Sequence, residues 1–133
     1  MRTRIVVRTK GQIEAEISEA LITFEREYMG RGPEEAKTYI VDDLIVVRLR
    51  GVLTPAEKNL AKIEDTPQGR NLIKQVRNEL LEKARPQLET IIRDITGQET
   101  TSLHTDISTT TGERVIIFSL DRSPELGATE GEV

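Results

Sequence analysis

The sequence predicts an α+β domain in which two β-hairpins form a four-stranded, mostly antiparallel sheet packed with three helices, in the order α-ββ-α-α-ββ. Three observations support this prediction. Two stretches carry apolar residues at helical spacing, and two pairs of β-branched segments are each joined by a short turn. The length of 133 residues suits a single domain with one core. The strand order cannot be read from the sequence.

The first helix is predicted over residues 11–29. Its apolar residues recur every three or four positions, which places them on one face, while glutamates mostly occupy the other. This apolar set consists of Ile13, Ile17, Ala20, Leu21, Phe24 and Tyr28. Gly30 and Pro33 then end the helix, because glycine suits a left-handed C-terminal cap and proline cannot continue a helix.

The first hairpin is predicted from residues 37–41 and 44–50, which are rich in β-branched side chains. Asp42 and Asp43 lie between the two segments, and aspartate tolerates turn conformations. Because adjacent residues on a strand point to opposite faces, these two carboxylates are poorly placed to act as an acid–base pair. We therefore interpret them as a turn.

Two helices are predicted to follow. Thr54 is a typical N-cap, followed by proline and a glutamate at the third helical position, so a short helix should run from residue 55 to about 64. A longer helix should cover residues 68–96, with a kink near residues 82–86 because Pro86 lies inside it. Its apolar stripe is expected to be Leu72, Ile73, Val76, Leu80, Ala84, Leu88, Ile91, Ile92 and Ile95. Part of this stripe is expected to meet a second copy, so we predict a homodimer.

The second hairpin is predicted from residues 100–108 and 113–121. Its second strand is apolar on both faces, which indicates an interior position in the sheet. The domain should then span residues 11–122, preceded by a basic segment, residues 1–10, and followed by a disordered acidic tail, residues 123–133.

The chain carries few side chains suited to catalysis. It contains one histidine, His104, and neither cysteine nor tryptophan. His104 and Asp106 share one strand face, but one histidine with one carboxylate is too few ligands for zinc. We expect no catalytic residue, no cofactor and no metal site, and therefore no enzyme.

Charge and hydropathy limit where the protein can be located and which partners it can bind. No apolar run approaches the roughly 18–20 residues that span a bilayer, and the N-terminus does not resemble a signal peptide. We expect a cytoplasmic protein without membrane insertion, at most peripheral to the inner membrane. The net charge of −4 disfavours nucleic acid as a partner. The element order is loosely that of one class of KH domain, but the Gly-x-x-Gly loop is missing and stacking aromatics are scarce.

Four polar residues are candidate contacts for a partner or ligand: Arg31, His104, Asp106 and Arg114. Arg31 lies in the Gly30–Pro33 loop, and the others lie on the second hairpin. The same hairpin residues also suit an ordinary polar strand face. In an alternative interpretation, Arg31 and His104 line a pocket that senses a small ligand or an anion.

Three segments resemble a bacterial family named after MpsC. They run from Lys10 to Glu35, beginning Lys-Gly-Gln-Ile-Glu, from Leu49 to Lys58, including Leu-Thr-Pro-Ala-Glu, and from Ser102 to Arg114, beginning Ser-Leu-His-Thr-Asp. The resemblance covers nearly everything between Lys10 and Asp121. The family name refers to a sodium-translocating system that generates membrane potential, which implies a soluble partner of membrane proteins in ion or inorganic-carbon uptake.

The resemblance therefore implies a non-enzymatic, cytoplasmic accessory or regulatory protein that acts by protein–protein contact with a membrane transport protein. It assigns no catalytic residue. A small-ligand or anion sensor is the first alternative, and a KH-like nucleic-acid-binding module is the second.

Overall fold

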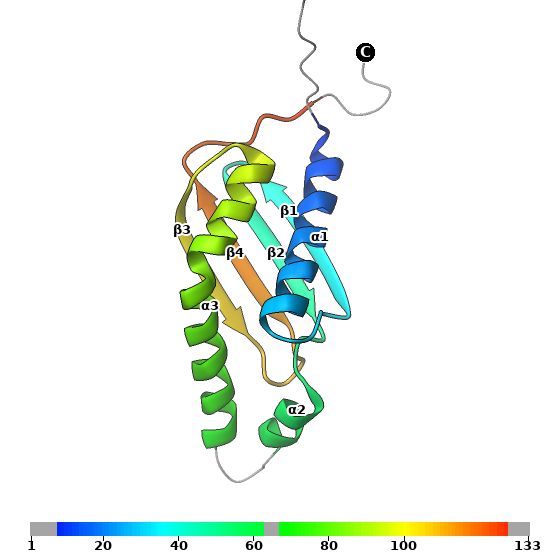
Figure 1. Ribbon diagram of the computed structural model, residues 1–133, viewed down its shortest axis with the longest axis vertical. Helices are drawn as coiled ribbons and strands as arrows, with labels where there is room; N and C mark the ends of the chain where they lie inside the picture. The colour runs from blue at the N-terminus through cyan, green and yellow to red at the C-terminus, as the bar shows by residue number, and fades with distance from the viewer. Residues whose placement is uncertain (1–7, 63–66, 128–133) are drawn as a thin grey trace, which may run out of the picture.

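The computed structural model describes residues 8–62 and 67–127, drawn as a ribbon in Figure 1. The elements are α1 (Lys10–Tyr28), β1 (Glu35–Val41), β2 (Leu44–Arg50), α2 (Pro55–Ala61), α3 (Gln68–Thr96), β3 (Thr100–Ile107) and β4 (Arg114–Leu120). The α+β class and the order α-ββ-α-α-ββ are confirmed.

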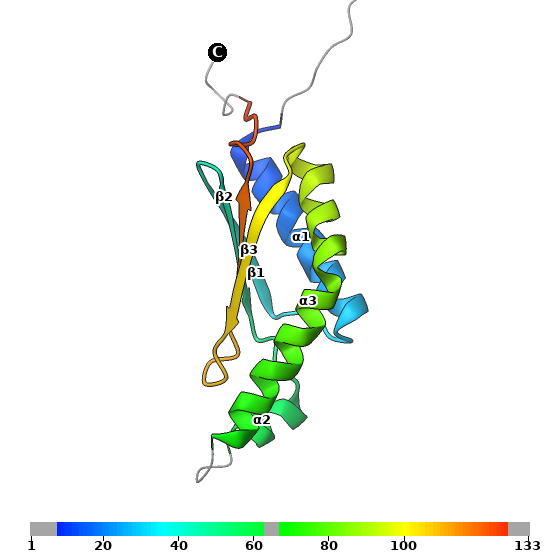
Figure 2. The same ribbon diagram turned by 90° about the vertical axis from the view of Figure 1, so that its left-hand side faces the viewer.

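The four strands form one antiparallel sheet in the order β1-β2-β4-β3. The two hairpins therefore join through β2 and β4, and β4 is an interior strand as its apolar pattern predicted. Figure 2 shows α1 and α3 packed on the same face of the sheet, while no described element covers the opposite face. The result is a two-layer domain with one open sheet face.

The element ends follow from local chemistry. Thr9 caps α1 and Thr54 caps α2, each in a capping box with the residue three positions later. Asp42 lies in the β1–β2 turn with φ at 55°, a left-handed conformation that aspartate tolerates better than most residues. Gly97 ends α3 with φ at 76°.

Of the two later helices, α3 has its predicted extent, residues 68–96, whereas α2 is shorter than predicted. The structure ends α2 at Ala61, and residues 63–66, where the sequence extended it, lie outside the described part. α3 passes through Pro86 without interruption, and its axis bends near the middle in both ribbon views. A proline lacks the amide hydrogen that would bond to the preceding turn, so a bend without a break is a common outcome.

The core lies between the inner sheet face and one face each of α1 and α3. On α1, Ile13, Ile17, Leu21 and Phe24 are buried as predicted. On α3 the buried set is Gly69, Ile73, Arg77, Leu81, Ala84, Leu88, Ile92 and Ile95. The predicted stripe is confirmed for Ile73 but wrong for Leu72, Val76 and Leu80, which are 51%, 48% and 37% exposed.

The two ends of the described chain, near residues 8 and 127, contact each other. Arg8 binds the side chain of Glu16 and the Ile95 carbonyl, and its own carbonyl accepts a 2.8 Å hydrogen bond from the Gly127 amide. Pro124 is buried. The expectations for residues 1–7 and 128–133 lie outside the described residues.

Candidate functional site

The open face of the sheet carries two of the four predicted contact residues. Strand pairing aligns its side chains in rows that cross all four strands. One row is Tyr39, Val46, Ile117 and His104, and the next is Lys37, Arg48, Val115 and Asp106. His104 and Asp106 both lie on the edge strand β3 and are exposed.

Asp106 is the more constrained of these two residues. Its Oδ1 accepts a 2.8 Å hydrogen bond from the Ile107 amide and lies 3.4 Å from Lys74 Nζ. The backbone hydrogen bond lowers the pKa of Asp106 by more than burial raises it, and the charge of Lys74 lowers it further. Asp106 is therefore a carboxylate at neutral pH, with 76% of its side chain exposed.

Arg31 lies at the end of the sheet where α1 leads into β1. Its guanidinium is 3.8 Å from Glu34. From the neighbouring Glu35, ion pairs continue across the open face through Arg50 to Glu113, at 3.5 and 3.9 Å. Glu113 also accepts a 2.6 Å hydrogen bond from Arg48. The Gly30–Pro33 loop and the β3–β4 hairpin thus lie at the same end of the sheet, with the ion pairs of Arg50 between them.

Arg114 does not lie on the surface where the sequence placed it. Its side chain is fully buried, because β4 turns residue 114 toward the helices together with Ile116 and Phe118. Its contact with Thr105 is long, at 3.4 Å, and its Nε and Nη2 find no hydrogen-bond partner among the described residues. Arg114 therefore cannot contact a partner in this conformation.

Instead, Arg114 belongs to a buried ionic cluster that we define as Glu25, Glu57, Arg77 and Arg114, which come from α1, α2, α3 and β4. Arg77 donates to both Glu57 oxygens, at 2.8 and 2.6 Å, and to the Val52 carbonyl at 2.9 Å. Burial alone would raise the pKa of Glu57, but the hydrogen bonds and charge of Arg77 and the hydrogen bonds of Thr54 lower it to about 2.

Glu25 behaves in the opposite way. Burial raises the pKa of its carboxyl group, and the nearby charges of Arg114 and Arg77 only partly offset this effect. Its two oxygens accept no hydrogen bond from the described residues. Burial likewise lowers the pKa of Arg114, with the charge of Glu25 opposing it. The cluster holds two carboxyl groups and two guanidinium groups, an equal number of acidic and basic side chains.

Sequence reasoning missed Glu25, Glu57 and Arg77 as members of a common cluster. The sequence did contain a signal for the burial of Glu25 and Arg77. Glu25 lies four residues after Leu21, and Arg77 lies four residues from both Ile73 and Leu81. Such positions share a helix face, so both charges occupy buried positions of their helices. Spacing alone could not show that the two charges meet.

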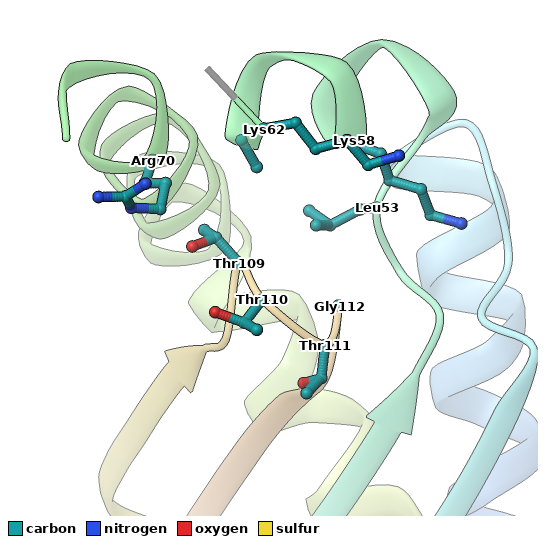
Figure 3. A pocket seen from close by; sticks show the side chains of 9 residues that line it. Leu53, Lys58, Lys62, Arg70, Thr109, Thr110, Thr111 and Gly112 are labelled. Carbon is teal, nitrogen blue, oxygen red and sulfur yellow. The ribbon is translucent and has the colours of Figure 1, made fainter. Parts of the chain in front are cut away.

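A cavity of about 350 Å³ lies where α2, the start of α3 and the β3–β4 turn meet. Its polar lining comprises Lys58, Lys62, Arg70 and the threonines 109–111. Figure 3 shows Arg70 on one side of the threonines and the two lysines on the other, with their charged ends directed apart. The cations therefore surround the cavity without converging on one point. Neither Arg31 nor His104 lines it.

Metal-binding groups and membrane-spanning helices are both absent from the described residues. Within residues 8–62 and 67–127, no group of three or more His, Cys, Asp or Glu side chains is arranged to hold a metal ion. Within the same residues, no helix combines the length and apolarity needed to cross a bilayer.

Comparison with known proteins identifies relatives along most of the chain. Residues 9–122 match the model of a family described as "Na+-translocating membrane potential-generating system (MpsC)". The uncharacterized protein YbcI of Bacillus subtilis is 45% identical over 113 residues, covering 85% of this chain and 89% of the relative. The uncharacterized protein YrhF of the same organism is 27% identical over 108 residues, covering 80% and 86%. No solved structure matches the chain.

Proposed function

Because the chain belongs to the MpsC family, we propose that it is a non-enzymatic accessory or regulatory protein of a membrane cation or inorganic-carbon transport system. The family match over residues 9–122 is the observation that carries this proposal. The protein acts by protein–protein contact, in the cytoplasm and at most peripherally to the inner membrane. Its lack of cysteine fits that compartment.

A non-catalytic role is supported by the side-chain chemistry. The single histidine is exposed on an edge strand, and two of the three carboxyl groups with shifted pKa values, Glu25 and Glu57, lie in the ionic cluster. That cluster connects four elements, which suits a structural role better than proton transfer to a substrate.

We place the contact with the transport protein at the hairpin end of the sheet, which we define as the Gly30–Pro33 loop and the β3–β4 turn, residues 108–113. The sequence indicated the Gly30–Pro33 loop and the hairpin of residues 102–114, which contains this turn. The ion pairs of Arg50 with Glu35 and Glu113 lie between the two segments. Thr110 and Thr111 are exposed there, so a partner could reach them.

The proposal is tested by photo-crosslinking in native cells. A photoreactive amino acid at Thr110 is expected to crosslink to an integral membrane transport protein, identified by mass spectrometry. The same group at Gln87, which is exposed on the far half of α3, is the matched control and should give no such product. Crosslinks from Thr110 to soluble proteins or nucleic acid only, or equal transporter crosslinks from both positions, would contradict the proposal.

The cavity supports a second candidate function, the binding of a small anion as a sensory signal. Its lining residues include three cations and three threonine hydroxyl groups, and no acidic residue among those described. Phosphate, added to the purified protein, should then raise the melting temperature of the wild type. The increase should disappear in a Lys58→Gln/Lys62→Gln/Arg70→Gln variant but persist in Lys83→Gln, whose lysine lies elsewhere on α3. No shift with wild type would exclude phosphate as the ligand.

A further inference from the structure

The open face of the sheet has an apolar centre that no described element covers. Across the two inner strands, Leu44, Val46, Val115 and Ile117 are only half-buried. Tyr39 and Val41 on the edge strand β1 are 43% and 52% exposed. An antiparallel sheet normally presents polar side chains to water on its free face, so a contiguous apolar centre marks a surface that meets another macromolecule.

We propose that this face binds a second copy of the chain, giving a symmetric dimer of two sheets packed face to face. The inference is independent of the proposed transport role and uses a different surface from the hairpin end. Two observations indicate that the partner of the open face is a second copy. They are the distribution of charge on the face and the order of residues within its rows.

The charges on the face are complementary to themselves. Lys37 lies on one edge strand and forms no ion pair with any described residue. Asp106 lies on the opposite edge in the same row, and its exposed carboxylate forms one ion pair among the described residues, a 3.4 Å contact with Lys74, besides its hydrogen bond from the Ile107 amide. The other cations of the face, Arg48 and Arg50, are already paired with Glu113 and Glu35.

A twofold axis parallel to the strands brings these two groups together. It places β1 over β3 of the partner and β2 over β4 of the partner, and each row then faces its own copy in reverse. Lys37 meets the partner's Asp106, and this ion pair occurs twice in the dimer. In the next row, Val46 meets the partner's Ile117 at the centre, and Tyr39 meets the partner's His104 at the rim.

The area of the open sheet face limits the affinity of the dimer. Four strands at about 4.8 Å and some 20 Å of strand length give a footprint of roughly 400 Å² per copy. This is about half of the ~800 Å² per partner of a standard stable interface, so the dimer should be reversible, with a micromolar dissociation constant. Measurements must therefore extend to high protein concentration.

The experiment is sedimentation velocity of the full chain from about 5 to about 500 µM, a range chosen for an interface of this size. Wild type should shift from monomer to dimer across it. Lys37→Glu and Asp106→Lys should each raise the dissociation constant about tenfold, since each dimer contains the pair twice. The double variant Lys37→Glu/Asp106→Lys restores opposite charges and should recover the wild-type constant.

Matched controls separate this face from the other exposed apolar surface. Lys83→Glu on α3 changes the net charge as Lys37→Glu does and should leave the dissociation constant unchanged. Tyr39→Arg should weaken the dimer, whereas Val76→Arg, at a similarly exposed residue of α3, should not. Melting temperatures close to wild type confirm that each variant is folded.

Three results would overturn the proposal. The first is a wild type that stays monomeric up to the highest concentration. The second is a double charge variant that dimerises no better than either single variant. The third is dissociation by Val76→Arg with no effect of Tyr39→Arg, because the dimer would then form through α3.

Discussion

At the scale of single residues, the buried carboxyl groups show how one environment can shift pKa values in opposite directions. Glu57 has a bidentate partner in Arg77, and its pKa is lowered to about 2 despite partial burial. Glu25 accepts no hydrogen bond from the described residues, so burial dominates and its pKa is raised. Glu57 is less deeply buried and accepts several hydrogen bonds, whereas Glu25 is deeply buried and accepts none, and both differences contribute to the opposite signs.

The pKa of Glu57 predicts a change in acid stability. Because the folded-state pKa is lowered from 4.5 to about 2, the contribution of Glu57 to stability is present above pH 4.5 and is lost as the pH falls toward 2. In Glu57→Gln, which keeps the size and one acceptor oxygen, this loss should be absent. Urea unfolding of both proteins across that pH range should therefore show the steeper decline in wild type.

The control for this measurement is Glu79→Gln, an exposed carboxylate on α3 that appears in no ion pair among the described residues. Its pH profile should run parallel to that of wild type. If Glu57→Gln also runs parallel to wild type, the Arg77 pair does not contribute to acid stability.

At the scale of elements, α3 carries two adjacent stripes of side chains, and the sequence alone cannot show which of them is buried. One contains Leu72, Val76 and Leu80, and is apolar throughout. The other contains Ile73, Arg77 and Leu81, and is interrupted by a charge. The structure buries the interrupted stripe, because Arg77 finds Glu57 and the Val52 carbonyl there. A charge with a bidentate counter-charge can thus occupy a core position, although Arg77 Nη1 has no hydrogen-bond partner among the described residues.

Truncation of two neighbouring leucines tests this assignment. Leu81 is 1% exposed, so Leu81→Ala should lower the free energy of unfolding by about 3 kcal/mol through lost packing and a new cavity. Leu80 is 37% exposed, and Leu80→Ala should cost less than about 1 kcal/mol. Chemical denaturation measures both. A larger cost at Leu80 than at Leu81 would show that the helix buries the other stripe.

At the scale of the whole molecule, the buried ionic cluster joins elements that are distant in the chain. Glu25 and Arg114 lie on α1 and β4, and each affects the pKa of the other through its charge. Such a pair adds little net stability, because removing two charges from water costs about as much as their attraction returns. Removal of one partner lowers the stability, since the remaining charge stays buried without that counter-charge.

A double-mutant cycle tests this coupling. Arg114→Met should lower the free energy of unfolding by about 3 kcal/mol or more, since it leaves Glu25 buried beside fewer positive charges. The variant Glu25→Leu/Arg114→Met should be more stable than Arg114→Met alone, because it replaces both charges with apolar groups. Urea denaturation at neutral pH provides the values. Strictly additive costs would show that the two residues act independently.

The sequence by itself determined the elements of this protein, because their signals are local. The capping Thr54, turn aspartates, helix-ending glycines and the spacing of apolar residues located the described helices and strands to within a few residues, and the apolar pattern of β4 indicated an interior strand. The same signals suffice for the α+β class. His104 and Asp106 were also correctly placed together on one strand face, because alternation along a strand depends only on position.

Only the tertiary structure decided which face of each element is buried when charge and apolarity compete. Arg114 and Glu25 were placed on polar surfaces by their chemistry, and they are buried because charges from other elements lie next to them. The strand order, which sets Lys37 and Asp106 at opposite edges of one row, likewise depends on contacts between distant segments. Such contacts have no local signal, because their energy arises only when the packed elements bring the groups together.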